Sequence, residues 1–423
     1  MLEINLIRNN PSEVIERLRF KNMDATETIE RILEVDARRR QTQKQLDDTL
    51  AESNRLAREI GSLHKEGKAK EAGFMKAQTA ELKKTTRGLQ DLLEQLAKEQ
   101  DELLITLPNV PSKLVPTGRG ADDNKVMSHE GDIPQLGPNA VPHWDLATKY
   151  EIIDFECGTK VTGAGFPVYK GKGARLQRAL ISFFLDNAVD AGYLEYQPPL
   201  VVNEDSAFAT GQLPDKEGQM YHVQSDNLYL IPTAEVPLTN FFRDMILSAR
   251  ELPVKCTAYS ACFRREAGSY GKDVRGLNRL HQFDKVEIVQ VTRQDDSYAA
   301  LEQMVEHVTR VLRKLELPFR VVKLCGGDMS FASALTYDFE VFSAAQQRWL
   351  EVSSVSNFET FQSNRLKLRY RGDDGRPVLA HTLNGSALAL PRIVAALLEN
   401  NQTPQGVLIP KALQQYTGFE VIQ

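Results

Sequence analysis

The sequence predicts an α+β protein in which an N-terminal antiparallel coiled-coil arm precedes a domain built on a mainly antiparallel sheet flanked by helices. Two observations predict the arm: residues 26–107 are almost free of proline and aromatic residues, and leucine recurs there at intervals of seven. A third observation predicts the sheet. Beyond residue 190, strand-like runs outnumber helical ones, and several neighbours are close enough to form hairpins.

The arm is predicted to contain two long helices that fold back on each other at a turn marked by Gly67 and Gly73. Each helix would hold roughly 35 to 40 residues and extend about 50–60 Å at 1.5 Å per residue. The apolar heptad positions are occupied by Ile32, Val35, Leu46, Leu56, Ile60, Leu63, Leu82, Leu89, Leu96 and Leu103.

The heptad seam of the arm is impure, because Arg39 and Ser53 stand where a dimerising zipper would have leucine. Basic clusters at Arg38–Arg40 and Lys83–Lys84 could bind phosphates, but they could equally form a solvated face. Periodicity alone therefore leaves both a dimerisation rod and a nucleic-acid-binding arm open.

Residues 107–124 are rich in proline and glycine and predict a domain boundary. We expect an N-terminal domain at 1–107 with its arm at about 26–104, a linker at 108–130 and a second domain at 131–423. In the second domain, helices are predicted at about 174–191, 297–315 and 391–400. Strands are predicted at 193–202, 228–231, 256–263, 282–291, 319–322, 337–342 and 349–354.

Composition favours a globular protein of the cytoplasm. Hydrophobic residues make up 42% and charged residues 26% of the chain, and its four cysteines are scattered without zinc-ligand spacing. The charged N-terminal segment predicts no signal peptide, and no apolar run is long enough for a membrane span. A net charge of −5 does not exclude nucleic acid as a partner, because local patches decide such binding.

One glycine-rich stretch, GAGFPVYKGKGAR at 163–175, contains the residue types of a phosphate-binding loop. It lacks the order G-x-x-x-x-G-K-[ST], and no strand of a βαβ unit is predicted before it. We therefore expect no P-loop or dinucleotide site here.

A second stretch predicts a hairpin with a long loop. Arg264 and Glu266 follow one strand, Gly268, Gly271 and Gly276 interrupt regular structure, and a second strand begins near residue 282. In that second strand, alternation places Val286 and Ile288 on one face, and Phe283, Lys285 and Glu287 on the other. Guanidinium groups bind phosphate or carboxylate through paired donors, and a Phe ring can stack on a base. An exposed charged hairpin is the alternative interpretation.

Two further stretches could carry chemistry. In WLEVSSVSNF, Glu351 and Ser353 would share a strand face and Ser354 would end the strand, which suits Mg²⁺ or an ordinary surface strand. In HTLNGSALALPRIVAALLEN, small residues allow close packing, and Arg392 follows Pro391 in the first turn of a helix. The helix dipole opposes a cation there, so a bound anion explains Arg392 better than stability does.

Together these stretches resemble the signature motifs of class II aminoacyl-tRNA synthetases, and most closely those of bacterial-type seryl-tRNA synthetases. The resemblance covers the whole chain. Motif 1 is matched at about 174–203, with Pro199 as its proline, motif 2 at about 256–291 and motif 3 at about 381–401. Motif 2 is carried by Phe263, Arg264, Glu266, Arg279, Phe283 and Glu287, and motif 3 by Gly385 through Arg392.

The resemblance implies roles for individual residues. It implies that Arg264 bridges the serine carboxylate and the α-phosphate, that Arg392 meets the γ-phosphate, and that both are catalytic. The implied serine pocket consists of Thr233, Ala234, Glu235, Arg264, Glu287, Thr382 and Ser386. The implied ATP site consists of Arg264, Arg265, Glu266, Phe283, Glu351, Val352, Ser353, Ser354 and Arg392, with Glu351 and Ser354 holding Mg²⁺.

The implied function is ATP-dependent ligation of L-serine to tRNA(Ser) by a homodimer joined through its catalytic domain, and the sequence leaves open whether tRNA(Sec) is a further substrate. The motif 2 loop would grip ATP at its base and reach the 3′ end of tRNA at its tip. Two departures from the family are Arg265, where serine is common, and Ala387, Ala389 and Pro391, where glycine, glycine and an acidic residue are frequent. The rival interpretations are a ligase acting on a carrier protein and a non-catalytic binding paralogue.

Overall fold

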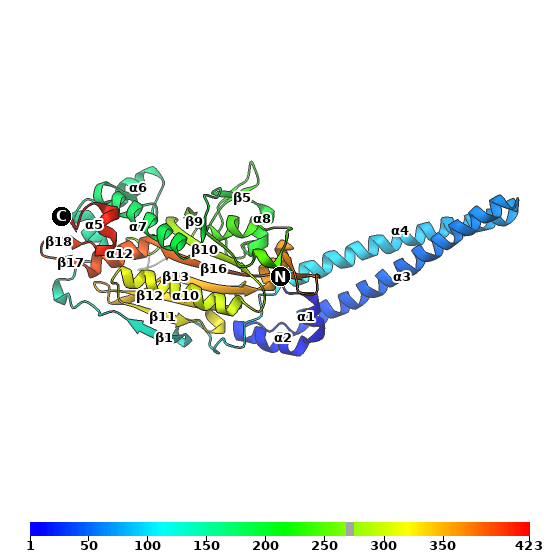
Figure 1. Cartoon of the computed structure of the whole chain (residues 1–423), viewed down its shortest axis with the longest axis horizontal. Coiled ribbons are helices and arrows are strands. Elements are labelled where there is room, and N and C mark those ends of the chain that lie inside the picture. Colours follow the sequence, from blue (N-terminus) through cyan, green and yellow to red (C-terminus); the bar gives the residue numbers. More distant parts are fainter. Residues whose placement is uncertain (268–274) are drawn as a thin grey trace. The chain divides into compact units, whose positions relative to one another are not determined.

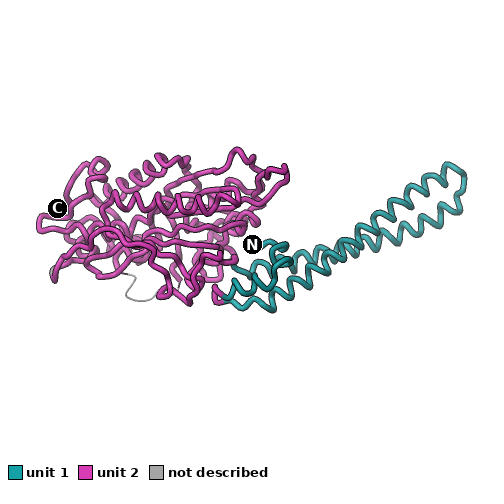
Figure 2. Tube along the Cα trace, turned by 60° about the horizontal axis from the view of Figure 1, so that its bottom comes forward, with its two compact units in different colours: residues 1–19, 23–108 teal, residues 20–22, 109–423 magenta. Residues whose placement is uncertain are grey.

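The computed structural model of the chain describes residues 1–267 and 275–423. The chain divides into two compact units, coloured separately in Figure 2. The first unit contains residues 1–19 and 23–108, and the second contains residues 20–22 and 109–423.

The α-helices, labelled in Figure 1 where there is room, are α1 (Ile4–Asn9), α2 (Pro11–Leu18), α3 (Thr26–Lys65), α4 (Ala69–Thr106), α5 (His143–Lys149), α6 (Phe155–Val161), α7 (Gly171–Asp190), α8 (Glu204–Thr210), α9 (Glu235–Asn240), α10 (Ser297–Lys314), α11 (Thr360–Leu366), α12 (Leu390–Asn400) and α13 (Lys411–Thr417).

The strands are β1 (Lys125–Glu130), β2 (Ile153–Asp154), β3 (Val168–Tyr169), β4 (Leu194–Glu195), β5 (Val201–Asn203), β6 (His222–Val223), β7 (Leu228–Leu230), β8 (Ile246–Leu247), β9 (Val254–Phe263), β10 (Gln282–Thr292), β11 (Phe319–Lys323), β12 (Leu335–Ser343), β13 (Arg348–Glu359), β14 (Arg369–Arg371), β15 (Pro377–Leu379), β16 (His381–Ala389), β17 (Gln402–Thr403), β18 (Gly406–Leu408) and β19 (Val421–Ile422).

The first unit contains the predicted antiparallel arm. Helices α3 and α4 run side by side and are joined by the turn 66–68 (Figure 1). Gly67 takes φ of +76° in this turn, a conformation that glycine adopts without a steric penalty. Gly73 was predicted to mark the turn as well, but it lies inside α4, so Gly67 alone has this role.

A buried polar group of the arm, the carboxylate of Asp36, finds its partners within the chain. Apolar residues of both helices are buried along it, among them Ile32 and Leu46 of α3 and Leu96 of α4. The buried carboxylate of Asp36 accepts hydrogen bonds from Arg8 Nε at 2.8 Å and from Arg40 Nε at 3.0 Å. A polar group inside the seam is therefore paired rather than left without partners.

The second unit is built on an eight-stranded sheet in the order β1-β11-β12-β13-β16-β10-β9-β4. Every neighbouring pair is antiparallel except β4 and β9. The predicted fold class, a mainly antiparallel sheet flanked by helices, is confirmed.

One face of this sheet carries the main core. Helices α7, α10 and α12 lie across it (Figure 1) and bury strand residues such as Val286 and Ile288 in one large apolar cluster. Because side chains alternate along a strand, Glu287 lies on the opposite face, where it is 1% exposed. The predicted division of β10 into an apolar and a charged face thus follows from its period of two.

The structure corrects the predicted strand at 193–202. Two short strands replace it, β4 and β5, and the residues between them include Pro198 and Pro199. Proline has no N–H to donate, so a run containing two prolines cannot pair continuously in a sheet. The structure also corrects the predicted linker at 108–130. Its last six residues, Lys125–Glu130, form β1, an edge strand of the main sheet.

None of the helices in the described ranges, 1–267 and 275–423, combines the length and the apolar character that crossing a bilayer requires.

Candidate active site

The base of the motif 2 hairpin brings Arg264 and Phe283 together. Strands β9 and β10 pair with Phe263 opposite Gln282, and the Arg264 N–H donates to the His281 carbonyl at 2.9 Å. The guanidinium carbon of Arg264 then lies 5.1 Å from the centre of the Phe283 ring. A guanidinium held over an aromatic face keeps its N–H groups in a fixed plane, ready for an anion.

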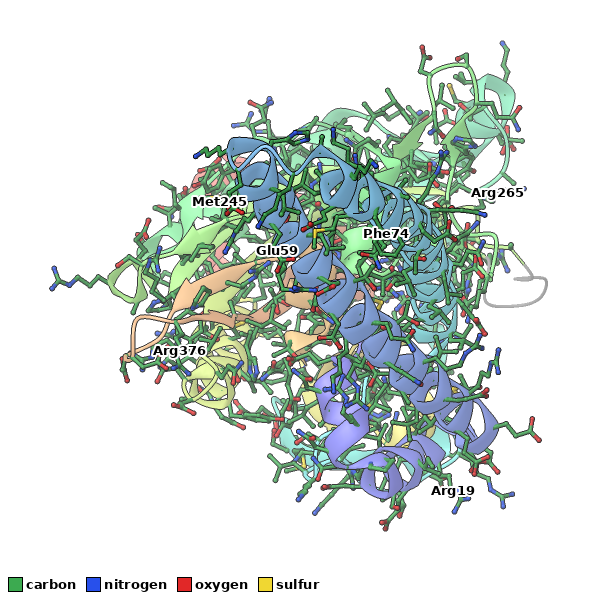
Figure 3. All side chains as sticks on the ribbon, turned by 90° about the vertical axis from the view of Figure 1, so that its right-hand side faces the viewer. Arg19, Glu59, Phe74, Met245, Arg265 and Arg376 are labelled. Atoms are coloured by element: carbon green, nitrogen blue, oxygen red, sulfur yellow. The ribbon has the colours of Figure 1, made fainter. Side chains whose placement is uncertain are left out.

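The next two residues of motif 2 have different surroundings. Arg265 is exposed (Figure 3), and its backbone N–H donates to the Gln219 carbonyl at 2.9 Å. Glu266 adopts a φ of +49°, unusual for a residue with a side chain, and its Oε2 accepts from Arg279 Nη1 at 3.0 Å. Glu266 and Arg279 therefore connect the two legs of the hairpin. The loop tip that was predicted to reach tRNA, including Gly268 and Gly271, lies outside the described residues.

A buried acidic pocket lies on the same hairpin. Thr233 Oγ1 donates to Glu287 Oε2 at 3.0 Å and accepts from the Glu235 backbone N–H at 3.2 Å. Lys285 Nζ forms an ion pair with Glu287 Oε2, and both side chains are buried. Lys285 was not predicted as a site residue, although its place two residues before Glu287 on one strand face was a usable signal.

Helix α11 and strand β16 complete this pocket. Gln362 Nε2 donates to Glu235 Oε1 at 2.7 Å, and Thr382 Oγ1 donates to Gln362 Oε1 at 2.7 Å. Sequence reasoning missed Gln362, because no local pattern in α11 distinguishes it from a surface glutamine. The predicted residue Ser386 stands opposite Glu287 in the β10–β16 register, and Ala234 is fully buried beside Glu235.

Burial dominates the electrostatics of Glu235. Desolvation, and next the charge of Glu287, raise the pKa of Glu235 from 4.5 to about 7. The hydrogen bond from Gln362 and the charges of Lys285 and Arg264 act in the opposite direction. The two carboxyl groups face two cations, and burial disfavours the ionised form of Glu235, so an ammonium bound beside Glu235 would lower its pKa again.

We expect Glu235→Gln to stabilise the free protein at about pH 8 but hardly at pH 4.5. With the raised pKa, the folded state binds more protons than the unfolded state between pH 4.5 and about 7, so the wild-type protein loses stability as pH rises through this window. The gain at pH 8 is up to about 3 kcal/mol, from 1.36 kcal/mol per pKa unit. Calorimetric Tm values at both pH values provide the measurement. A gain of equal size at both would show that Glu235 is ionised throughout.

The predicted metal ligands lie together because of a β-bulge. Strand β13 pairs with β12 so that Ser353 is opposite Phe339 and Glu351 is opposite Glu340, with Val352 as the extra residue. Ser353 thus shares the core face with Phe339, whereas Glu351 and Ser354 share the other face. This corrects the expectation that Glu351 and Ser353 lie on one face and that Ser354 ends the strand. Val352 and Ser353 could touch a nucleotide only through their backbone.

Asp338 joins the two predicted metal ligands. Asp338 stands opposite Ser354 in the β12–β13 register, and Ser354 forms a hydrogen bond with it. Burial, and next the charge of Glu351, raise the pKa of Asp338 well above its usual value. Its buried Oδ1 has no partner among the described residues. The described residues contain no group of three or more His, Cys, Asp or Glu side chains arranged for a metal. These oxygen donors fit Mg²⁺, which takes few protein ligands and keeps most of its bonds to water and phosphate.

Arg392 lies beside this group of oxygen donors, in the first turn of α12. Its Nη1 donates to the Glu351 carbonyl at 2.7 Å and lies 3.7 Å from Glu351 Oε2, and its Nε donates to the Asn278 carbonyl at 3.2 Å. The side chain is 30% exposed. The guanidinium is therefore fixed from two sides while part of it faces solvent, where an anion can reach it.

The glycine-rich stretch at 163–175 packs against the hairpin. The Gly165 carbonyl accepts from the His281 N–H at 2.9 Å, and the Phe166 ring stacks on the His281 ring with centroids 5.4 Å apart. Its glycine thus serves close packing, since a Cβ at Gly165 would lie 2.4 Å from His281 Cδ2.

Family models and full-length relatives both match this chain to tRNA synthetases. The seryl-tRNA synthetase N-terminal domain matches residues 1–111, and the tRNA synthetase class II core domain (G, H, P, S and T) matches residues 221–401. A serine–tRNA ligase of Salinibacter ruber is 51% identical, covering 99% of this chain and 98% of its own length. Another, of Chlorobaculum parvum, is 46% identical and covers all of both chains.

Solved structures agree with these sequence matches. The seryl-tRNA synthetase of Pyrococcus horikoshii, solved with ATP, superposes with a TM-score of 0.94 at 34% identity, covering 100% of this chain and 99% of its own. The cytoplasmic enzyme of Naegleria fowleri, solved with AMP, gives 0.89 at 26% identity with the same coverage. The resemblance predicted from the motifs is confirmed, and the chain belongs to the seryl-tRNA synthetase family.

Proposed function

We propose that this chain, which like its family attaches serine to tRNA, does so in two steps around the β9–β10 hairpin. In the first step the serine carboxylate attacks the α-phosphorus of ATP, and pyrophosphate leaves. In the second step the terminal adenosine of the tRNA attacks the mixed anhydride, and AMP leaves. The observation that supports this proposal most directly is the acidic pocket of Glu235 and Glu287 beside the stacked guanidinium of Arg264.

Serine is proposed to bind with its ammonium toward the carboxyl groups of Glu235 and Glu287. Its hydroxyl would then be read by the buried Thr382–Gln362 pair, and its carboxylate would point to Arg264. Neutralising the carboxylate and the developing phosphorane charge requires cations held in place before the reaction. The stacking of Arg264 on Phe283 supplies such preorganisation.

ATP is proposed to lie along the same face of the sheet. The structural neighbour from Pyrococcus horikoshii was solved with ATP. From the motif residues we infer that Phe283 and Glu266 would hold the adenine and that Arg392 would meet the γ-phosphate. Glu351 and Ser354 would hold Mg²⁺, with Asp338 behind them, and the ion would supply positive charge to the phosphates. The described side chains provide no covalent nucleophile at this site, so positioning and charge neutralisation carry the catalysis.

The macromolecular partners are also proposals. The arm of α3 and α4 would bind tRNA(Ser), and tRNA(Sec) is a second candidate substrate. Two chains would pair through the motif 1 region, which exposes the apolar side chains of Leu194, Leu200 and Val201 along an edge of the main sheet and its neighbour. We assign the activity to the cytoplasm. A carrier-protein ligase or a non-catalytic paralogue is disfavoured by the match to the seryl-tRNA synthetase N-terminal domain and by the 51% identity to a serine–tRNA ligase over 99% of the chain.

Serine-dependent exchange of pyrophosphate into ATP tests the first step, and Thr382→Val tests how serine is selected. Wild-type protein should support exchange with serine but not with alanine, because an unfilled polar pocket typically disfavours the smaller analogue by about 10⁴–10⁵. Thr382→Val removes the donor to Gln362, and we expect the serine-to-alanine ratio of kcat/KM to fall by at least about tenfold. The KM for ATP should change less than about twofold.

Thr382→Ser is the matched control, since it keeps the hydroxyl and should keep the ratio. An unchanged ratio in Thr382→Val would mean that Thr382 does not read the serine hydroxyl. A wild-type protein without serine-dependent exchange would overturn the proposed adenylation itself.

A further inference from the structure

A buried His–Glu pair lies outside the residues given a role above. The carboxylate of Glu399, in the last turn of α12, accepts from His143 Nδ1 at 2.7 Å and from the His143 backbone N–H at 3.0 Å. Both side chains are fully buried. Burial acts to raise the pKa of Glu399, but hydrogen bonds from His143 and Ser343 outweigh it, so the pKa is lowered and Glu399 is ionised.

The second ring nitrogen of His143 binds the motif 2 hairpin. Its Nε2 accepts the backbone N–H of Leu277 at 2.8 Å. Because Nε2 is an acceptor, the imidazole is neutral and its proton is on Nδ1, where Glu399 takes the hydrogen bond. Leu277 belongs to residues 275–281, here named the return stem, which lead back into β10.

The residues after His143 hold the start of the return stem. The guanidinium of Arg275 lies 4.6 Å from the centre of the Trp144 ring and 3.7 Å from Asp145 Oδ1. Gly276 has φ of +67°, and a Cβ there would lie 2.3 Å from His143 Nε2. The first turn of α5 therefore grips three consecutive residues of the stem, and the close approach requires glycine in the middle.

The next stem residue connects this grip to Arg392. The Asn278 carbonyl accepts from Arg392 Nε at 3.2 Å, and Asn278 Nδ2 donates to Gln346 Oε1 at 3.0 Å. Gln346 Nε2 donates in turn to Glu399 Oε1 at 3.0 Å. A closed circuit thus runs from Glu399 through His143 and the stem to Asn278, and back through Gln346.

We propose that the His143–Glu399 pair is a positioning device for the ATP site: it fixes the return stem, and through the Asn278 carbonyl it sets the guanidinium of Arg392. This inference rests on the proposed role of Arg392 at the γ-phosphate. Apolar side chains of similar volume often stabilise a core as well as a buried ionic group with its partners does, so stability alone does not require this network. The network instead fixes the orientation of the stem, because hydrogen bonds hold two of its backbone groups, the Leu277 N–H and the Asn278 carbonyl.

The test separates the two ring nitrogens of His143 by substitution. In His143→Asn the amide reaches the place of Nδ1 and can serve Glu399, but the Leu277 N–H loses its acceptor. In His143→Gln the amide oxygen reaches the place of Nε2 and can accept from Leu277, while Glu399 keeps Gln346 and Ser343 as donors. In serine-dependent pyrophosphate exchange, we expect His143→Asn to raise the KM for ATP about tenfold and His143→Gln about twofold or less, with the KM for serine unchanged in both.

A second pair of variants keeps the test decisive if His143→Asn does not fold. Gln346 is half-buried, and Gln346→Ala removes the link between Asn278 and Glu399 without emptying the core. Its neighbour Gln347 is exposed, and its side chain donates to the nearby Ala344 carbonyl, so Gln347→Ala is the matched control. Gln346→Ala should raise the KM for ATP several-fold relative to this control.

Combination with Arg392→Ala distinguishes the outcomes. If the pair acts through Arg392, neither His143→Asn nor Gln346→Ala should raise the KM for ATP further in the Arg392→Ala background. The inference is wrong if these variants leave the KM for ATP at the control value, if His143→Asn and His143→Gln are equally impaired, or if the full effect persists without Arg392. If Arg392→Ala itself leaves the KM for ATP unchanged, the proposed role of Arg392 fails instead.

Discussion

Replacing Arg264 with alanine is expected to slow seryl-adenylate formation by two to three orders of magnitude while leaving the fold intact. A charge-assisted contact that strengthens in the transition state is worth roughly 3–4 kcal/mol. The hairpin itself should survive, because the anchor at this position is the backbone N–H of Arg264 on the His281 carbonyl, which alanine keeps. Single-turnover adenylate formation, with saturating serine and ATP, provides the measurement.

Arg265→Ser is the control for this prediction. The two arginines are adjacent, but Arg264 is stacked on Phe283 whereas Arg265 is exposed (Figure 3). Arg265→Ser should therefore change the rate by less than about threefold, as substitutions outside a transition-state contact do. Equal losses in the two variants would show that the wrong arginine has been placed in the site.

Shortening the arm is expected to impair the second step without affecting the first. Deleting residues 46–59 and 75–88 removes two heptads from each helix, so the apolar seam stays in register and the turn with Gly67 is kept. We expect aminoacylation of tRNA to fall about 10²-fold through a higher KM for tRNA, because the shortened arm would lose the phosphate contacts proposed for it. Serine-dependent pyrophosphate exchange should stay within about twofold of wild type.

The same variant decides between the two functions that the heptad pattern left open. Sedimentation should show an unchanged dimer, because the buried residues of α3 and α4 satisfy each other within one chain. The dependence of tRNA affinity on salt should become less steep, since fewer counterions are released. A monomer would identify the arm as a dimerisation rod, and normal charging of tRNA by a shortened dimer would remove its proposed role.

Several features of the molecule could be predicted because their signals are local. A period of seven predicts the arm, and a period of two predicts which face of β10 carries Val286 and which carries Glu287. Motif 2 places Arg264 and Phe283 on the two legs of one hairpin, so their contact follows from short-range pairing. The prolines at 198 and 199 were equally visible, and the prediction of one strand there was wrong because their missing donors were given too little weight.

Other features depend on groups that are distant in the sequence. Gln362 meets Glu235 across 127 positions, and His143 meets Glu399 across 256. The sheet order brings β13, β16 and β10 together although long segments separate them in the chain, and no local periodicity records that order. The bulge at Val352, which turns Glu351 toward Ser354, is likewise a property of how two strands pair and not of either strand alone.

The sequence by itself was enough to predict the arm and the fold class, and its motif residues were enough to predict the family. Each of these predictions depends on local spacing or on residue types at fixed intervals. Only the tertiary structure decided which distant side chains lie around the site: Gln362 between Glu235 and Thr382, Asp338 behind Glu351 and Ser354, and the His143–Glu399 pair behind the return stem. The physical reason is that a buried polar group takes its partners from whatever the packing brings within about 3 Å. That proximity is set by sheet order, register and bulges, which the linear order of residues does not record.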